Sequence, residues 1–450
     1  MIIRVIAKNI FSFKETTEFN TLTSSKIREL PHHKLKKGKY NVLKFSAIYG
    51  NNASGKSNLI KIVSLIDSVV TNGELPINCL NQQFRFDNKL QDKESEVALE
   101  FIVNKKSYFY ALSFLNKDII EESLYLNKNN SFVEIFSKKI NKHGEIKINF
   151  NNEEGLQLSK FFENILNPKN SLMYYIGNEY KGKEKFIKPI KEIYNWFEND
   201  LLIIYPNSKP DLYTPFIFDK QNLYKKIITD TVKLFNLGID SLDFRKKEVS
   251  IKELKENLPE NFYSKILNEK KGNFPAISSN DFSEYYYKDV KNDKYYLCEI
   301  IALQSNKNNE LQEFKLRELS DGTNRLIDFI PMFISKINTD STVLIDEIER
   351  SLHPNMIKEI LKFFSGEQKI DGQLIFSTHE SLLLDLDIFR QDEIWFTEKN
   401  PEGATEFYSL NEFSEHHTKD IRKGYLNGRY GAIPFLGNFQ KLITDKDAQP

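Results

Sequence analysis

The sequence predicts an α/β protein that carries an additional antiparallel β layer, and three features lead to this fold class. A glycine-rich turn at residues 50–55 joins an apolar stretch to a stretch with helical periodicity. Two further apolar stretches, residues 342–345 and 374–377, lie near the C-terminal end. Several short segments between residues 83 and 126 are rich in the aromatic and β-branched residues that favour strands.

The elements are predicted in order from these patterns. Apolar and polar residues alternate over the first twenty positions, which favours strands, and residues 42–49 form another apolar strand. Apolar residues at helical spacing predict a helix over residues 56–70. The predicted strands of the antiparallel layer are the segments FRFD, SEVALEFIV, SYFYALSFL and IIEESLYL. Near the C-terminal end, a helix is expected over residues 356–364 between the two apolar strands.

Between these parts, residues 156–291 show an irregular helical pattern without sustained heptads, so we expect a compact helical insertion rather than a long coiled coil. The predicted organisation is an N-terminal half of the α/β domain at 1–126, a β edge with the helical insertion at 127–297, and a C-terminal half with a tail at 298–450. Tyr285, Tyr286 and Tyr287 could stack on bases, but an aromatic core is the favoured interpretation.

The composition excludes several classes of protein. Lys and Arg together number 63, as do Asp and Glu, so no global basic excess draws the chain to nucleic acid or to a membrane surface. Cys79 and Cys298 are too few for a disulfide framework, and no window has 18 uninterrupted apolar residues. We therefore expect a cytoplasmic protein without a membrane partner. A basic loop between residues 26 and 39 is interpreted as solvated, with a nucleic-acid contact as the alternative.

The clearest motif is Gly50-Asn51-Asn52-Ala53-Ser54-Gly55-Lys56-Ser57, which is followed by Asn58. It matches G-x-x-x-x-G-K-[ST] between a predicted strand and a predicted helix, and this combination predicts a phosphate-binding P-loop. Glycines let backbone N–H groups surround phosphate oxygens, Lys56 would reach the outer phosphates of ATP, and Ser57 would bind Mg²⁺.

Two carboxylates, Asp346 and Glu347, end the apolar strand at residues 342–345. This arrangement suits a metal-side acid, Asp346, and a base for the attacking water, Glu347. An apolar strand that ends in an acid is common, so the motif has little weight alone. Glu349 and Arg350 come shortly after these carboxylates. They could form an ion pair at the start of a helix, or they could supply a second metal ligand.

A third motif lies at residues 319–325, where Ser320 and Gly322 open a predicted helix. Such a helix start can bind an anion held by another subunit, whereas the simpler interpretation is an N-cap serine. His379 follows the strand at residues 374–377, where a lone histidine is usually structural.

The order of these motifs resembles the ABC-type ATPase head of transporters, SMC-type proteins and OLD-family proteins. The resemblance implies that Ser320 and Gly322 belong to the signature that covers ATP across a dimer of heads, that Glu347 is the catalytic base, and that His379 is the switch histidine. It also implies a D-loop at residues 351–354 and a Q-loop metal ligand, for which Gln83 is preferred over Gln82.

Within that superfamily, the strings at residues 345–354 and 425–434 resemble the stand-alone ATPases of bacterial anti-phage and abortive-infection loci. These include RloA-type proteins, the ATPase of the AbiL system and the AriA subunit of PARIS. The resemblance spans residues 1–126 and 298–440. Transporter subunits are usually much shorter, and SMC-type proteins have a long coiled coil where this chain has its insertion.

OLD-family nucleases continue into a toprim domain, but only 71 residues follow His379 here. The resemblance therefore implies a homo-oligomer of head dimers that controls a separate effector, of toprim, RloB-like or other nuclease type, with DNA or a phage protein as trigger. A DNA-binding, repair-like ATPase without a dedicated toxin is the alternative. The tail at residues 424–437 is either an ordered, turn-rich segment or a docking tail.

Overall fold

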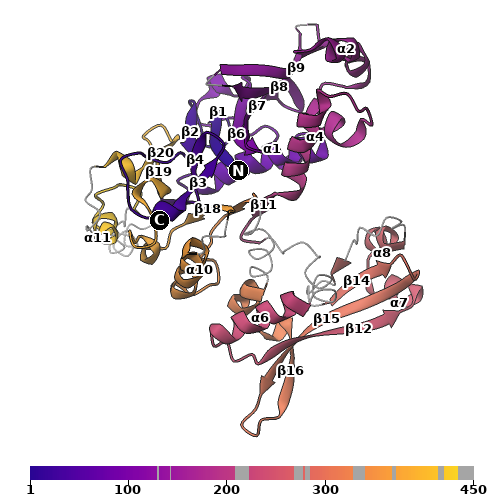
Figure 1. Ribbon diagram of the computed structural model, residues 1–450, viewed down its shortest axis with the longest axis vertical. Helices are drawn as coiled ribbons and strands as arrows, with labels where there is room; N and C mark the ends of the chain where they lie inside the picture. The colour runs from indigo at the N-terminus through magenta and orange to yellow at the C-terminus, as the bar shows by residue number, and fades with distance from the viewer. Residues whose placement is uncertain are drawn as a thin grey trace, which may run out of the picture. The chain divides into compact units, whose positions relative to one another are not determined.

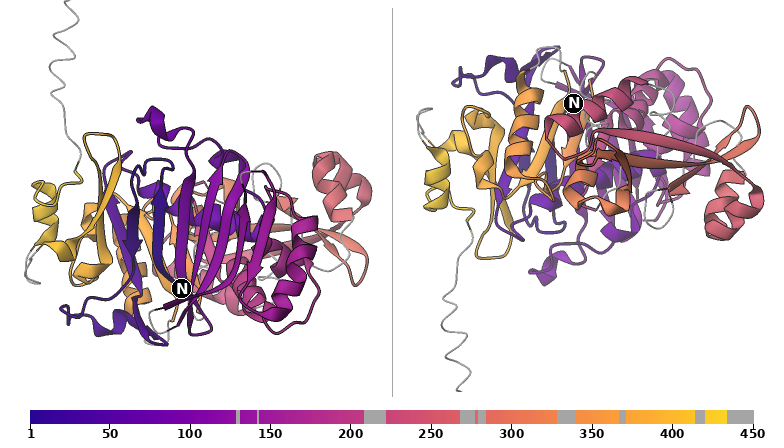
Figure 2. Two further views of the ribbon diagram at one scale, coloured as in Figure 1. Left: turned by 90° about the horizontal axis from the view of Figure 1, so that it is seen from above. Right: turned by 90° about the horizontal axis from the view of Figure 1, so that it is seen from below.

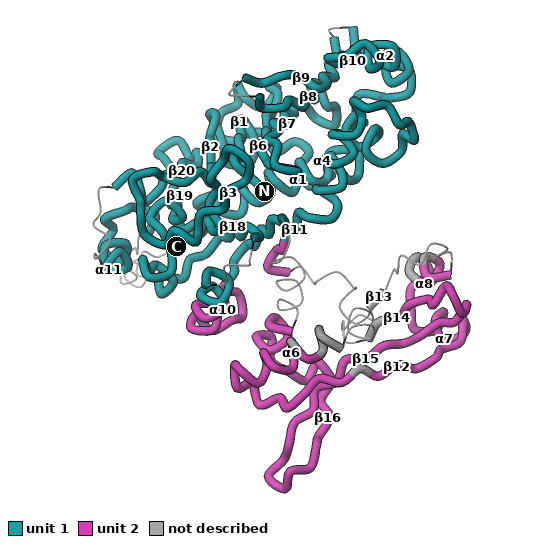
Figure 3. Tube along the Cα trace, in the orientation of Figure 1, with its two compact units in different colours: residues 1–203, 339–348, 361–450 teal, residues 204–338, 349–360 magenta. Residues whose placement is uncertain are grey.

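The computed structural model describes residues 1–128, 131–141, 143–207, 222–267, 277–278, 284–327, 340–366, 371–413 and 420–433. The chain divides into two compact units, coloured separately in Figure 3. The first contains residues 1–203, 339–348 and 361–450, and the second contains residues 204–338 and 349–360.

A six-stranded sheet forms the centre of the first unit, in the order β11-β17-β18-β5-β19-β20. Its strands are β5 (Phe45–Gly50), β11 (Leu201–Ile204), β17 (Thr342–Ile345), β18 (Gln373–Thr378), β19 (Ile394–Lys399) and β20 (Thr405–Ser409). β17, β18, β5 and β19 run parallel, and β20 runs antiparallel to β19. Every residue of β5 is buried, as expected for a parallel strand that is covered on both faces.

A seven-stranded antiparallel sheet forms the second layer of this unit, in the order β10-β9-β8-β7-β6-β1-β2. Figure 2 shows these strands side by side. They are β1 (Ile2–Lys8), β2 (Thr17–Asn20), β6 (Ser95–Val103), β7 (Lys106–Leu115), β8 (Asp118–Lys128), β9 (Ser131–Ile140) and β10 (Ile146–Phe150). The first unit also contains a small antiparallel hairpin of β3 (Lys34–Lys37) and β4 (Tyr40–Leu43).

Helix α1 (Lys56–Asn72) connects the two layers, because it contacts β5 of one sheet and β1 and β6 of the other (Figure 1). Its apolar residues recur at helical spacing and are buried, which explains why this stretch is a helix in a β-rich region. The other helices of the unit are α2 (Glu153–Ile165), α3 (Leu172–Tyr174), α4 (Ile187–Asn199) and α11 (Ile421–Leu426), and α10 (Pro354–Gly366) includes residues of both units. Short helical turns are η1 (Pro31–His33), η2 (Ile77–Cys79), η3 (Asn88–Leu90), η4 (Tyr175–Glu179), η6 (Ser381–Leu383), η7 (Gln391–Glu393) and η8 (Leu410–Glu412).

The second unit has its own antiparallel sheet, in the order β12-β15-β14-β13, with β16 paired to β15. The strands are β12 (Ser241–Val249), β13 (Ile277–Ser278), β14 (Glu284–Asp289), β15 (Lys294–Ser305) and β16 (Leu311–Lys315). The helices are α6 (Asn222–Leu234), α7 (Ile251–Asn257) and α8 (Glu260–Leu267), with the turn η5 (Leu316–Glu318). A cluster of buried residues from β12, α7, α8 and β14 forms a core of this unit.

Several sequence predictions are corrected here. The predicted boundary after residue 126 falls inside β8, and the boundary before residue 298 falls inside β15, so neither separates compact units. The segment FRFD is not a strand, because it pairs with no neighbouring strand. The segment predicted as a helical insertion contains helices, from α2 to α8, but it also contains the strands β11 to β14.

The structure also bears on three other predictions. Tyr286 and Tyr287 are 3% and 5% exposed, so they belong to the core, whereas the side chain of Tyr285 lies outside the described residues. In the basic loop, which is predicted to be solvated, Lys26, Arg28 and Lys36 are exposed, whereas Lys37 pairs with Asp340 at 2.6 Å and Lys34 donates to the Ile27 carbonyl at 3.1 Å. Across the described residues, no helix combines the length and the apolar character needed to cross a bilayer.

Candidate functional site

The candidate site is at the carboxyl ends of the parallel strands. β18 lies between β17 and β5, with Phe376 opposite Ile345 and Ser377 opposite Ile48. The segments that leave β17 and β5 therefore begin on either side of the end of β18. This is the edge of a parallel sheet at which ligands bind in open α/β folds.

The P-loop follows β5 and turns into α1 as predicted. Gly55 has φ of 115° at the N-cap of α1, and a Cβ atom there would lie 2.2 Å from Thr405 Oγ1, so no other residue fits. The Lys56 side chain is 7% exposed, and its ammonium donates to the carbonyls of Gly50 at 2.7 Å and Asn51 at 3.0 Å. The ammonium thus lies across the loop, among backbone groups that phosphate oxygens would contact.

Asp346 joins the P-loop to the two strands beside it. Its Oδ1 atom accepts a hydrogen bond from the Ser57 hydroxyl at 2.9 Å and another from the Ser377 hydroxyl at 2.5 Å. Asp346 is 4% exposed, so this contact is sheltered from water. The structure therefore brings together the predicted acid and the predicted hydroxyl ligand, which are 289 positions apart in the sequence.

Glu347 has an unusual backbone conformation. Its φ of 53° is in the left-handed region, which costs a residue with a Cβ atom about 1–2 kcal/mol. The Glu347 N–H donates to the Ser377 hydroxyl at 2.8 Å, and this bond holds the turn. Residues held in such conformations are found preferentially at functional sites. His379 is exposed and directly follows β18, at the same edge of the sheet.

Gln83 is only 7% exposed and lies in the loop before η3. A cavity of about 410 Å³ beside the start of α1 is lined instead by its neighbour Gln82, with Ser12, Asn58 and Lys61 among the other lining residues. Of the two predicted Q-loop candidates, the one that faces this cavity is therefore Gln82.

Ser320 and Gly322 lie in the second unit. The Ser320 hydroxyl accepts a hydrogen bond from the Thr323 N–H at 3.2 Å, so Ser320 is the N-cap of the helix that begins at residue 321. A Cβ atom on Gly322 would lie 2.5 Å from the carbonyl of Ser351, so this glycine allows a close approach to the predicted D-loop.

A group of hydroxyl side chains that contacts Ser54 of the P-loop was not predicted. Ser54 Oγ lies 2.6 Å from Thr397 Oγ1, and Thr405 Oγ1 lies 2.7 Å from both the Ser12 hydroxyl and the Ser54 carbonyl. Asn58 donates to Ser12 Oγ at 2.8 Å. The four hydroxyl residues come from three distant parts of the chain, so no local motif marks them. Ser377 was also missed, although a small hydroxyl residue at the end of a predicted strand, two positions before His379, was a usable signal.

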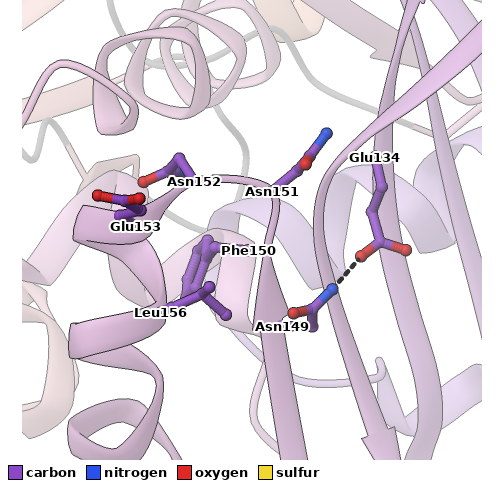
Figure 4. A pocket seen from close by; sticks show the side chains of 7 residues that line it. All are labelled: Glu134, Asn149, Phe150, Asn151, Asn152, Glu153 and Leu156. Atoms are coloured by element: carbon purple, nitrogen blue, oxygen red, sulfur yellow. Dashed lines mark hydrogen bonds between the residues drawn. The ribbon is translucent and has the colours of Figure 1, made fainter.

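A second hollow, of about 610 Å³, lies where β9, β10 and α2 meet (Figure 4). Three of its polar side chains are engaged in hydrogen bonds, because Asn149 donates to Glu134 at 2.9 Å and Asn152 accepts from the Gly155 N–H at 2.7 Å. None of the predicted site residues lines it. It is therefore not a candidate for the same chemistry.

The residues present fit a magnesium ion bound together with phosphate. Ser57 and Asp346 offer two hard oxygen ligands that already lie in contact. No group of three or more His, Cys, Asp or Glu side chains that could hold a metal by itself occurs in the part of the chain that the structure describes. Mg²⁺ commonly takes few protein ligands and completes its shell with phosphate oxygens and water.

No curated protein sequence matches the chain. A crystal structure of the SmcHead bound to the C-winged helix domain of ScpA is similar at 14% identity, over 91% of this chain and 97% of that chain, with a TM-score of 0.42. The SMC head domain from Thermotoga maritima is similar at 11% identity, over 91% and 98% of the two chains, with a TM-score of 0.37.

A family model matches residues 45–385, a range that begins at β5 and ends beyond His379. It includes the P-loop, Asp346, Glu347 and the second unit. The P-loop at the edge of a parallel sheet, together with the antiparallel layer, confirms the predicted fold class of an ATPase head. By this match the chain belongs to the family described as "AAA domain, putative AbiEii toxin, Type IV TA system".

Proposed function

We propose that this chain binds ATP with Mg²⁺ in its P-loop and hydrolyses it, as the sensor and scaffold subunit of a bacterial anti-phage, abortive-infection system that controls a separate toxin or nuclease effector. The observation that carries the ATPase part is the convergence on Asp346. One buried carboxylate oxygen accepts hydrogen bonds from Ser57 of the P-loop and from Ser377 at the end of the intervening strand.

The chain supplies the groups that phosphate binding requires. The N–H groups at the start of α1 would face a bound phosphate, and the helix N-terminus adds positive potential. The Lys56 ammonium, now bonded to loop carbonyls, would turn to phosphate oxygens, which are charged and therefore stronger acceptors. Mg²⁺, when bound by Ser57 and Asp346, would neutralise charge on the outer phosphates.

Glu347 is the group best placed to accept a proton from the attacking water. It follows Asp346 directly, it is partly exposed, and its backbone is fixed by Ser377. A carboxylate in this role needs to be close to the metal-side acid without being a ligand itself. The left-handed turn at Glu347 interrupts the strand direction just after Asp346.

The defence role is supported by the family description, which names a putative toxin of a toxin–antitoxin system. The strings at residues 345–354 and 425–434, which resemble the ATPases of abortive-infection loci, also support it. The alternative of a DNA-binding ATPase has less support, because the chain has no excess of basic over acidic residues. Within the basic loop, Lys37 is ion-paired with Asp340.

Two substitutions separate binding from hydrolysis. Lys56→Ala should weaken ATP binding by about a hundredfold or more, because the loop loses its charged contact to the outer phosphates. Glu347→Gln should bind ATP as tightly as the wild type and lose turnover by a factor on the order of 10²–10³. Calorimetry with Mg²⁺ and ATP gives the affinity, and phosphate release gives the turnover.

Glu349→Gln is the matched control, since it makes the same change two residues further on and should leave turnover near wild type. If Glu349→Gln abolishes turnover while Glu347→Gln does not, the choice of base is wrong. In cells that carry the chain with its neighbouring genes, both Lys56→Ala and Glu347→Gln should lose protection in a phage plating assay. Full protection by both variants would refute an ATP-driven defence role.

A further inference from the structure

The C-terminal segment, residues 420–433, lies against the strands that lead into the P-loop. Phe396 of β19 is opposite Tyr49 of β5, one position before the P-loop begins. The Phe396 ring stacks on Tyr425 with centroids 5.7 Å apart and on Tyr430 with centroids 5.6 Å apart. Tyr425 and Tyr430 are 4% and 1% exposed, so the segment is packed into the core of the first unit.

Polar contacts fix the path of the segment beyond Tyr430. The Tyr408 hydroxyl donates to the Tyr430 carbonyl at 2.7 Å, and the Tyr425 hydroxyl donates to the Ala432 carbonyl at 3.0 Å. The Ala432 N–H donates to the Glu398 carboxylate at 3.3 Å. These bonds come from β19, β20 and α11, and they bring the backbone of Ile433 to the P-loop.

The contact with the P-loop is made by Asn51. Its side-chain amide donates a hydrogen bond to the Ile433 carbonyl, while its Oδ1 atom is buried and has no hydrogen-bond partner among the described residues. The bond to Ile433 is therefore the described contact that orients this side chain. Asn51 is the second residue of the P-loop, and its own carbonyl accepts from Lys56. One residue thus touches both the C-terminal segment and the ammonium that phosphate would attract.

We propose that residues 425–433 are a positioning element of the P-loop, and that Asn51 couples nucleotide binding to the docking of this segment. The inference rests on the proposed binding of ATP in the loop. A bond that fixes the loop lowers the cost of ordering it around phosphate. By linkage, nucleotide must in turn stabilise the docked segment, because coupling between two sites is reciprocal.

Gly431→Ala is the variant that tests the coupling. Gly431 has φ of 64°, and a Cβ atom there would lie 2.6 Å from both the Glu398 carboxylate and the Tyr408 hydroxyl, so the segment must shift. Gly144→Ala is the control, since Gly144 has φ of 79° and nothing within 4 Å of its Cβ position, in the turn between β9 and β10. It imposes comparable backbone strain without a clash.

Tyr408→Phe gives a second test that does not depend on backbone strain. It removes the bond to the Tyr430 carbonyl but keeps the ring that packs on Phe396 and Phe413. Both Gly431→Ala and Tyr408→Phe should weaken ATP binding. The affinity should fall roughly tenfold in Gly431→Ala, which is the loss expected for one orienting hydrogen bond, and by less in Tyr408→Phe. Gly144→Ala should bind like the wild type.

Hydrogen exchange of residues 425–433, measured in the full chain, distinguishes a coupled segment from a merely structural one. If the segment were only structural, ATP would not change its exchange rates. In the wild type, Mg²⁺ and ATP should slow exchange in these residues, and Gly431→Ala should reduce that protection. If the wild type binds ATP but both variants bind it as tightly as Gly144→Ala, and exchange is unchanged by ATP, the inference is overturned and the proposed function stands. If the wild type does not bind ATP, the proposed function and the inference both fall.

Discussion

Asp67, on the fourth turn of α1, has a carboxyl group with an unusual environment. Its Oδ1 atom is buried and has no hydrogen-bond partner among the described residues. Burial raises the pKa of this carboxyl from 3.8 to about 7. The folded chain therefore binds a proton at Asp67 more tightly than the unfolded chain does. Its contribution to stability is lost as the pH rises from about 4 to 7, because over this range the unfolded chain releases the Asp67 proton while the folded chain still holds it.

Asp67→Asn should remove this pH dependence. The variant should match the wild type below pH 4 and become more stable than it as the pH rises, by on the order of 2 kcal/mol at pH 8, since the residue keeps some exposure. Thermal unfolding at pH 5 and pH 8 measures the difference. Asp92→Asn is the control, because Asp92 is exposed. Equal gains at both pH values would contradict the assignment to Asp67.

The residues of the site could be predicted to different extents. Lys56, Ser57 and Asp346 were found because each is part of a short motif whose spacing reflects one local turn. Ser12, Thr397 and Thr405 were not found, because their role depends on which strands become neighbours. Sheet order is a long-range property, and a single sequence holds no local sign of it.

Among the elements, the helix that begins at residue 321 has the clearest link between capping and proposed function. Ser320 caps it through the Thr323 N–H, which would be sufficient reason for a serine at this position. The same hydroxyl and the adjacent N–H groups would also suit a phosphate, as the resemblance to ATPase heads implies. Stability and turnover must be measured separately to distinguish the two roles.

Ser320→Asp makes that distinction, since aspartate is as good an N-cap as serine but would repel a phosphate. Stability should remain near wild type while ATP turnover falls by at least about tenfold. Ser320→Ala should show the opposite balance, with a loss of about 1 kcal/mol in stability and a smaller effect on turnover. If Ser320→Asp turns over ATP like the wild type, Ser320 is only a cap.

Several elements of the first unit could be predicted, because β17 and β18 contain short apolar runs and α1 has apolar residues at helical spacing. β12 was missed for a physical reason: its residues 245–248 are all exposed, so no two-residue alternation is visible. FRFD was misread because Phe84 is buried and Phe86 is 78% exposed, although they have the spacing of one strand face. Phe84 is held instead by a bond from its N–H to Asn9 Oδ1.

For the whole molecule, the proposed machinery is divided between the two units. The P-loop, Asp346, Glu347 and His379 belong to the first unit, and Ser320 and Gly322 belong to the second. The resemblance to ATPase heads implies that the signature of one chain completes the site of another. A two-fold dimer would then contain two composite sites.

Mixing two inactive chains tests that arrangement. Lys56→Ala retains an intact Ser320, and Ser320→Asp retains an intact Lys56, so a mixed dimer would place both lesions in one site and leave the other complete. Mixing should restore up to about a quarter of wild-type turnover, since half of the dimers are mixed and each has one intact site. No recovery, under conditions where mixed oligomers are shown by tag capture, would indicate that each chain acts alone or that both sites must be intact.

The position of β5 has a consequence for how the chain is made. Both neighbours of this fully buried strand come more than 300 residues later, since Ser46 pairs with Ile375 and Ala47 with Ile394. At translation rates of about 5–20 residues per second, β5 leaves the ribosome roughly 15–60 s before either partner exists. During that interval an apolar segment with unpaired edges is open to misassociation, so nascent chains should depend on chaperones. Any product of premature termination before residue 373 would lack β18 and β19, and it could not assemble the proposed ATP site however intact its P-loop.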